Sequence, residues 1–149
     1  MSCANCANMY QKSSVDAYTQ AGQTVVTGSP VTFVNGTRTG CSINFTAGTT
    51  SIKLAKPGLY QVQFSAYGAE SGTAGNITVQ MYRNGVAVPG AVSSANSTTV
   101  TDVKAIGFSS VVRVLPSCAV IDNDVTLTFV NTGVGATFGN VQATVVKLA

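Results

Sequence analysis

The feature that most constrains this chain is the strict alternation of apolar and polar residues between Leu59 and Tyr67. Successive side chains of a β-strand point to opposite faces, so a period of two indicates a strand with one buried face. The segment therefore predicts a long, half-buried strand. Its core face would carry Tyr60, Val62, Phe64 and Ala66, and its polar face Gln61, Gln63 and Ser65.

Shorter segments of the same character follow along the chain, separated by turn residues. Asn35-Gly36 and Asn84-Gly85 predict tight turns, and the Ser-, Thr- and Asn-rich stretch Ala91–Thr101 predicts a long loop that could include an edge strand. No window has the period of an amphipathic helix. The pattern is typical of an all-β, antiparallel sandwich. Its other predicted strands are 25–26, 31–34, 42–45, 51–54, 77–82, 86–90, 109–115, 124–130 and 140–148.

Composition narrows the functional classes. Charged residues make up 9% of the chain and histidine is absent, which excludes catalysis by an imidazole base and zinc sites with histidine ligands. Eight Lys and Arg stand against five Asp and Glu, so the net charge of +3 is spread thinly and no run of cations indicates a nucleic-acid site. We therefore expect no enzymatic activity and no nucleic-acid partner.

The first residues differ in character from the rest of the chain. They are polar and have no sustained period, which predicts an extended N-terminal arm over 1–22 ahead of one domain over 23–149. The start has no signal-peptide pattern, and no apolar segment approaches the ~20 residues that span a bilayer. We expect a product that is made in the cytoplasm, binds no membrane, and either stays there in solution or leaves the cell by a route that needs no signal, such as lysis.

Two residues separate Cys3 from Cys6, a spacing found in metal sites and in redox dithiols. A redox site of the thioredoxin type needs a βαβ context that the pattern lacks, and a zinc site would need Cys41 and Cys118 to converge on the N-terminus. Free or disulfide-paired thiols are the preferred interpretation, with a structural metal as the alternative. No cofactor is expected.

The remaining candidate residues favour structural interpretations. Asp122 and Asp124 could contribute to a Ca²⁺ loop, but such a site gathers six to eight oxygen ligands, so a polar turn is preferred. Glu70 is expected to be a solvated charge at a loop tip. The rings of Tyr60, Phe64 and Phe129 are expected in the core. Four Asn-x-Ser/Thr sequons follow from the composition and are not expected to be glycosylated: Asn35, Asn44, Asn76 and Asn96.

Two stretches resemble the tumour-necrosis-factor and complement globular-head superfamily. The first is 52–60, with Pro57-Gly58-Leu59-Tyr60 opening a major strand, and the second is the hairpin over 79–90 around Arg83-Asn84-Gly85. Later segments resemble the family as well, and the likeness spans about residues 24 to 149. These segments are Ser110–Val114, Asp124–Phe129 and Val145–Leu148.

The resemblance implies a ten-strand jelly roll that assembles as a homotrimer. In such trimers one face of the Pro-Gly-x-Tyr strand packs in the sandwich and the other faces the three-fold axis. Gln61, Gln63 and Ser65 would then face neighbouring subunits. These positions are more apolar in animal members, so a polar axis, together with low charge and loops rich in small residues, resembles the bacterial and bacteriophage branch.

That branch implies a non-enzymatic virion structural protein: a head decoration, a head fibre or a tail-associated protein released by lysis. The N-terminal arm would dock on a capsid or tail protein through Cys3, Cys6 and Tyr10. One alternative is a module that binds a host receptor or surface glycan through the loops Gly68–Gly75 and Ala91–Thr101. Others are a spore or cell-surface coat protein, although no collagen-like stalk is present, and a redox or metal enzyme built on Cys3 and Cys6.

Overall fold

The structure, a computed structural model, describes residues 12–115 and 125–149. These residues form eleven strands and contain no helix, so none that could cross a membrane. Sheet A consists of β1 (Ser14–Thr19), β2 (Gln23–Val25), β3 (Asn35–Thr39), β6 (Gly58–Glu70), β9 (Lys104–Val114) and β11 (Ala136–Lys147). Sheet B consists of β4 (Ile43–Asn44), β5 (Ser51–Leu54), β7 (Gly75–Arg83), β8 (Val86–Ser97) and β10 (Val125–Asn131).

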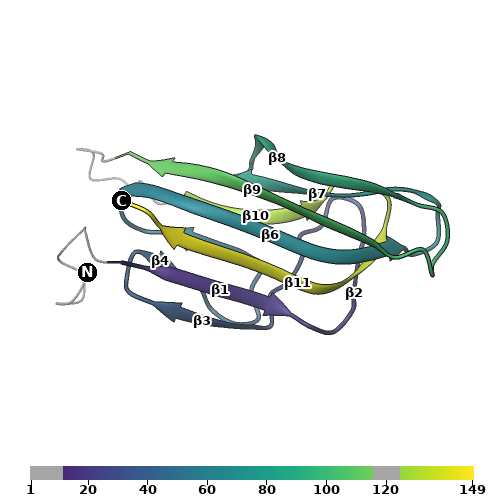
Figure 1. Ribbon diagram of the computed structural model, residues 1–149, viewed down its shortest axis with the longest axis horizontal. Helices are drawn as coiled ribbons and strands as arrows, with labels where there is room; N and C mark the ends of the chain where they lie inside the picture. The colour runs from purple at the N-terminus through teal and green to yellow at the C-terminus, as the bar shows by residue number, and fades with distance from the viewer. Residues whose placement is uncertain (1–11, 116–124) are drawn as a thin grey trace.

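The two sheets pack face to face as a sandwich (Figure 1). The strand order is β3-β1-β11-β6-β9 in sheet A, with β2 beside β11, and β4-β5-β10-β7-β8 in sheet B. Every strand pairing is antiparallel. After β8 the chain alternates between the sheets, through β9 in sheet A, β10 in sheet B and β11 in sheet A. This confirms the predicted antiparallel β-sandwich.

The predicted long strand is β6, and it organises sheet A. Tyr60, Val62, Phe64 and Ala66 are buried, whereas Gln63 and Ser65, which alternate with them, are exposed. β6 pairs with β11 on one side and with β9 on the other. The alternation predicted this strand and its buried face correctly because one face packs against sheet B while the other faces outward.

Aromatic rings fill the centre of the core. Phe64 of β6 stacks on Phe129 of β10 across the two sheets, and Phe108 of β9 stacks on Phe64. Phe33 meets Phe129 edge to face, with ring centroids 5.7 Å apart. Together with the fully buried ring of Tyr60, these contacts confirm that Tyr60, Phe64 and Phe129 belong to the core.

Two predicted hairpins are confirmed. β4 and β5 pair directly, as expected if the predicted strands 42–45 and 51–54 form a hairpin across a turn at 47–49. Asn84 and Gly85 have φ angles of 50° and 80° and connect β7 to β8. Both angles lie in the left-handed region that a type I′ hairpin turn requires.

The boundary of the predicted N-terminal arm is wrong. Ser14–Thr19 is a strand, β1, that lies between β11 and β3, and its residues Val15 and Ala17 are fully buried. Two small apolar residues in a polar stretch make an alternating run that is too short to identify a strand from the sequence. The strand forms because β11, from the far end of the chain, pairs with it. The β-sandwich therefore begins before residue 23.

Two other sequence predictions need correction. Asn35-Gly36 does not close a strand as a turn, because Asn35–Thr39 forms β3, which pairs with β1. In Ala91–Thr101 the possible edge strand is confirmed, since β8 continues to Ser97 and pairs with β7, and the loop is shorter than predicted. Both strands lie at sheet edges, where a neighbour on one side supplies the hydrogen bonds and no long apolar face is needed.

Candidate subunit interface

The residues predicted to meet a neighbouring subunit lie on the outer face of sheet A. Gln61 is half-buried, and Gln63 and Ser65 are exposed. The register places Gln63 between Thr144 of β11 and Ser109 of β9. Three further side chains, missed by sequence reasoning, therefore belong to this face at the level of Gln63: Ser109, Thr144 and, beyond Thr144, Asp16 of β1.

The outer face changes in character along the strands. Gln61 lies between two exposed valines, Val146 of β11 and Val111 of β9. Ser65 lies between Gln142 and Gly107. The row at Gln61 is thus partly apolar, and the rows at Gln63 and Ser65 are polar. The alternation in segments 109–115 and 140–148 indicates which of their side chains face outward. Only the register shows that these side chains lie beside those of β6.

Small residues create a hollow in the middle of this face. Ser65, Ser109, Gln63, Gln142 and Thr144 line a depression of about 480 Å³, with the rings of Phe64 and Phe108 beneath it. The absence of a side chain at Gly107, opposite Ser65, deepens the sheet surface there. Such a surface can accept a protruding side chain from another molecule.

Asp16 is the acidic residue of this face. Its Oδ1 accepts a 2.7 Å hydrogen bond from Nε2 of Gln142 and a long 3.5 Å contact from the hydroxyl of Thr144. The carboxylate therefore orients the amide of Gln142 at the rim of the hollow. No cation lies within ion-pair distance of Asp16 in the part of the chain that the structure describes.

The other predicted site residues lie outside the described ranges. These are the docking residues Cys3, Cys6 and Tyr10, and the carboxylate pair Asp122 and Asp124. Cys41, between β3 and β4, is disulfide-bonded. No group of three or more potential metal ligands occurs within residues 12–115 and 125–149.

The expectation that Glu70 is a solvated charge at a loop tip is wrong. β6 extends to Glu70, which is 6% exposed, and its Oε2 accepts a 2.8 Å hydrogen bond from the backbone N–H of Gly72. Its own backbone N–H donates to the hydroxyl of Ser97 at the end of β8. The strand continues through small and polar residues to Glu70 because β11 pairs with it to that point, whereas the pairing with β9 ends at Gly68.

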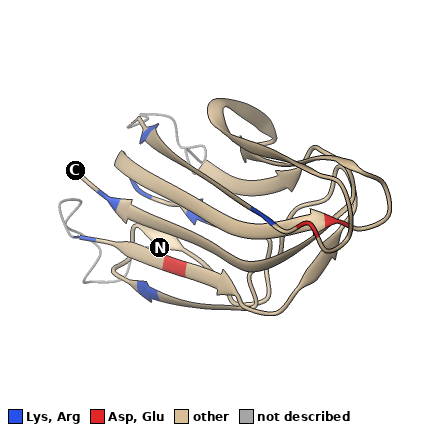
Figure 2. Cartoon of the chain, turned by 45° about the vertical axis from the view of Figure 1, so that its right-hand side comes forward, with Lys and Arg blue, Asp and Glu red and all other residues tan. Residues whose placement is uncertain are grey.

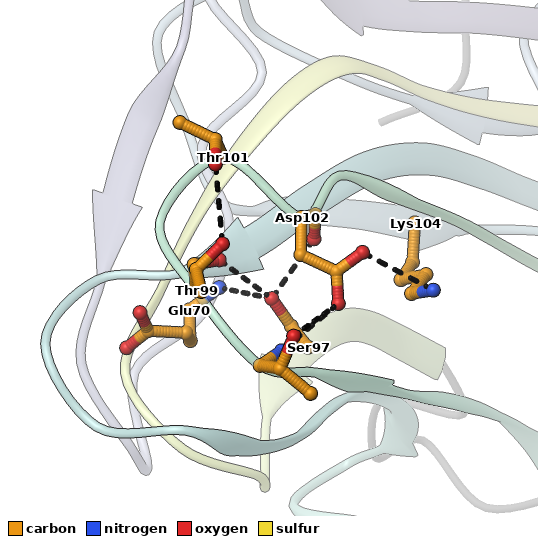
Figure 3. A network of polar contacts seen from close by, with 7 residues as sticks. Glu70, Ser97, Thr99, Thr101, Asp102 and Lys104 are labelled. Carbon is orange, nitrogen blue, oxygen red and sulfur yellow. Dashed lines mark hydrogen bonds and ion pairs between the residues drawn. The ribbon is translucent and has the colours of Figure 1, made fainter.

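The adjacent β8–β9 loop is held by a polar network (Figure 3). The carboxylate of Asp102 accepts hydrogen bonds from the backbone N–H and the hydroxyl of Thr98, at 2.9 and 3.0 Å, and lies 3.2 Å from Nζ of Lys104. The N–H of Thr98, and then the ammonium of Lys104, hold the pKa of Asp102 below its usual value. The exposed Val100 at the loop tip is thus presented on an ordered backbone.

Comparison with known proteins supports the architecture. No family model and no curated protein matches the chain. Murine APRIL at pH 5.0 superposes with a TM-score of 0.65 at 12% identity, covering 93% of this chain and 100% of that one. Eiger TNF from S. frugiperda has a TM-score of 0.65 at 13% identity, with 93% and 92% covered. The PRD1 vertex protein P5 has a TM-score of 0.55 at 16% identity, with 92% and 97% covered.

At these identities the similarity concerns the fold. The neighbours include two TNF-type proteins and a vertex protein of a virus, so the same sandwich serves unrelated purposes. The two sheets and their antiparallel pairing agree with these neighbours. The chain has the jelly-roll β-sandwich fold of the TNF-like proteins.

Proposed function

We propose that this chain is a non-enzymatic structural protein of a bacteriophage virion, a homotrimeric jelly roll that decorates or projects from the particle. The observation that carries the proposal is the outer face of sheet A, where polar side chains and a hollow of about 480 Å³ surround Gln63. The presence of the PRD1 vertex protein P5 among the structural neighbours supports a virion role. The TNF-like resemblance supports three-fold self-association.

A closed trimer would also protect the open sheet edges. β8 and β9 end their sheets on the same side of the sandwich, and the backbone N–H of Gly107 donates to the hydroxyl of Ser93 across the gap between them. Long edge strands are sites of aggregation unless something covers them. Assembly about a closed axis covers such surfaces without forming open filaments.

The first test is the mass of the purified protein by light scattering coupled to size exclusion. We expect about 45 kDa, three times the 15.2 kDa of one chain. Gln63→Arg should lower the mass to that of a single chain, because three added charges would have to be buried together. The matched control is Thr128→Arg, on the outer face of the central strand β10 of sheet B, which should leave the mass unchanged. A single-chain mass for the unmodified protein would contradict the trimer.

The second test concerns the particle. The protein should be found by mass spectrometry in purified virions. If the N-terminal segment attaches it, the full-length triple variant Cys3→Ser, Cys6→Ser, Tyr10→Ala should retain the trimer mass and be missing from particles. Protein that is found only free in the lysate would overturn the virion role.

A second candidate function is saccharide binding. The apical loops 71–74 and 98–103 contain no aromatic residue, but a hollow of about 190 Å³ at the bulge of β11 is lined by Tyr18, Gln20, Asn140 and Gln142. One ring and three amides form the type of surface on which a sugar ring can stack and hydrogen-bond. The volume is well below the ~300 to 1,000 Å³ of sites for drug-sized ligands, which favours a single sugar unit.

The binding of N-acetylglucosamine, followed by nuclear magnetic resonance, tests this alternative. Shifts of the Asn140 and Gln142 side-chain amides that disappear in Tyr18→Ala and persist in Tyr82→Ala would favour a glycan-binding module. Tyr82 is the control because it is another partly exposed tyrosine, on the outer face of sheet B. The absence of shifts at millimolar sugar would rule out this site for that sugar.

A further inference from the structure

The fold collects charges that are scattered along the sequence. Four cations mark one end of the sandwich through their places on the strands: Arg113 pairs with Leu59 at the start of β6, Lys147 ends β11, Arg83 ends β7 and Lys53 lies in β5 beside the first residues of β10. Figure 2 shows Lys and Arg concentrated toward the end of the sandwich where the C-terminus lies. We call this end the basic end. Lys12 precedes β1, Lys56 precedes β6 and Arg38 pairs with Val15 near the start of β1, so they lie at this end as well. The strand positions therefore place seven of the eight Lys and Arg there: Lys12, Arg38, Lys53, Lys56, Arg83, Arg113 and Lys147.

Most of the other charges of the described chain lie away from this end. Lys104, the eighth cation, pairs in register with Gly68 near the far end of β6 and forms an ion pair with Asp102, close to Glu70 (Figure 3). Asp16 of β1 lies nearer the basic end, since its partner in β3, Thr37, is next to Arg38. Asp122 and Asp124 fall outside the described ranges, and counting all three of these carboxylates against the basic end still leaves four of its seven positive charges in excess. The expectation that the charge is spread thinly is therefore wrong in three dimensions.

The three arginines of the basic end are available for contacts with another molecule, whereas Lys147 is buried and 7% exposed. Arg83 and Arg113 have no ion-pair or hydrogen-bond partner within residues 12–115 and 125–149, and Arg38 donates only to the amide oxygen of Asn44, at 2.9 Å. All three arginines of the chain are thus at this end. Arginine is enriched in protein interfaces because its planar guanidinium binds carboxylates through two parallel hydrogen bonds.

Aliphatic side chains are exposed among these cations. Val86 is 69% exposed, Leu115 62% and Leu148 51%. Tyr67, at 51% the most exposed aromatic residue of the described chain, lies on β6 away from this end, and Tyr82 beside Arg83 is only partly exposed. Protein interfaces combine apolar contacts with charged rims, whereas proteins that bind single-stranded nucleic acids need aromatic rings for base stacking. The mixture favours a protein partner.

We infer that the basic end is a docking surface for an acidic surface of another protein. Residues 1–11 join the described chain at this end, because Lys12 precedes β1 there and the carbonyl of Ser13 accepts the N–H of Lys147. The identification of the partner as a virion protein rests on the proposed function; the charge distribution does not. Positive potential at one end would orient the approaching molecule with this end toward its partner.

Binding of a fluorescent hexadecaglutamate peptide to the full-length protein, measured by anisotropy, tests the inference. Replacing Arg38 and Arg83 together by Gln should weaken binding about tenfold or more, since both lose their charge and keep much of the aliphatic stem. Lys104→Gln is the matched control, because it removes one cation from the opposite end, and it should change binding less than twofold. Equal losses in the double variant and the control would overturn the inference.

Two further measurements complete the test. Carbodiimide coupling should join peptide carboxylates to Lys12 and Lys56 and not to Lys104; coupling spread equally over these three lysines would contradict a localised surface.

A 20-base-pair DNA duplex and phosphatidylserine vesicles are the competing probes. Tighter, Arg38- and Arg83-dependent binding to either one would overturn an acidic protein partner. The peptide assay requires neither a trimer nor a virion. A single-chain mass by light scattering would therefore count against the proposed function and leave the inference about the basic end unchanged.

Discussion

The ring of Phe64 stacks on the ring of Phe129 with centroids 5.1 Å apart and planes inclined by 14°. Phe64 comes from β6 of sheet A and Phe129 from β10 of sheet B, so the pair joins the two layers at the centre of the sandwich. Phe129 also contacts Phe33 and Phe108. It is the ring on which the aromatic core converges.

Phe129→Ala should therefore lower the free energy of unfolding by about 3–5 kcal/mol, the range for removing a buried phenylalanine and leaving a cavity. Urea denaturation measures this loss. Val86→Ala is the control, since Val86 is mostly exposed, and it should change stability by less than about 0.5 kcal/mol. A loss below about 1 kcal/mol for Phe129→Ala would contradict a tightly packed centre.

Gly133 follows β10 and lies against β7. A Cβ at this position would overlap the backbone oxygen of Asn76 and press on the backbone nitrogen of Thr78. Because backbone cannot move aside easily, Gly133→Ala should destabilise the fold by about 1–3 kcal/mol. Gly72→Ala is the control, since a Cβ there would meet nothing within 4 Å. Equal melting temperatures for the two variants would show that the β10–β11 turn adjusts at no cost.

Tyr60 should make the free energy of unfolding depend on pH in the alkaline range. Burial raises the pKa of its hydroxyl from 10.0 to about 12, and the protonated hydroxyl donates a 2.6 Å hydrogen bond to the carbonyl of Lys56. The unfolded chain loses this proton near pH 10 and the folded chain only near pH 12, so the contribution is complete below pH 10 and is lost as pH rises to 12. Tyr60→Phe should reduce the fall in denaturation midpoint between pH 9 and 11.5. An identical fall in both proteins would contradict the raised pKa.

Asp102 should control the order of the β8–β9 loop. Its pKa is lowered by the N–H of Thr98 and by Lys104, so the interactions are complete above the ordinary pKa of 3.8 and are lost as pH falls below it. Asp102→Asn should speed hydrogen exchange at the amide of Thr98 at pH 7 and leave β6 protected. Lys104→Gln removes only the ion pair and should have a smaller effect. Unchanged exchange in Asp102→Asn would mean that the loop is held by other contacts.

Local pattern was sufficient for much of the fold. The faces of β6 were predictable residue by residue, because apolar side chains at every second position can be buried only on one side of an extended strand. The same reasoning succeeded for Ile77, Val79 and Met81 in β7, all fully buried. It failed for β1, β3 and much of β8, whose composition is polar or small and whose extended conformation depends on partners distant in the sequence.

The candidate sites, too, were predictable from the sequence only in part. The alternation predicted that Gln63 would point away from the core, but its neighbours Ser109 and Thr144 became known only from the register, because strand order is decided by packing of the whole chain. The basic end is a second example of a site that only the structure shows. Seven cations spread from Lys12 to Lys147 indicate nothing as a sequence, and they gather because antiparallel pairing returns their strands to the same end of the sandwich. The sequence by itself determined which side chains face the core, since the two-residue period is local; only the tertiary structure decided which side chains meet, since long-range pairing sets their neighbours.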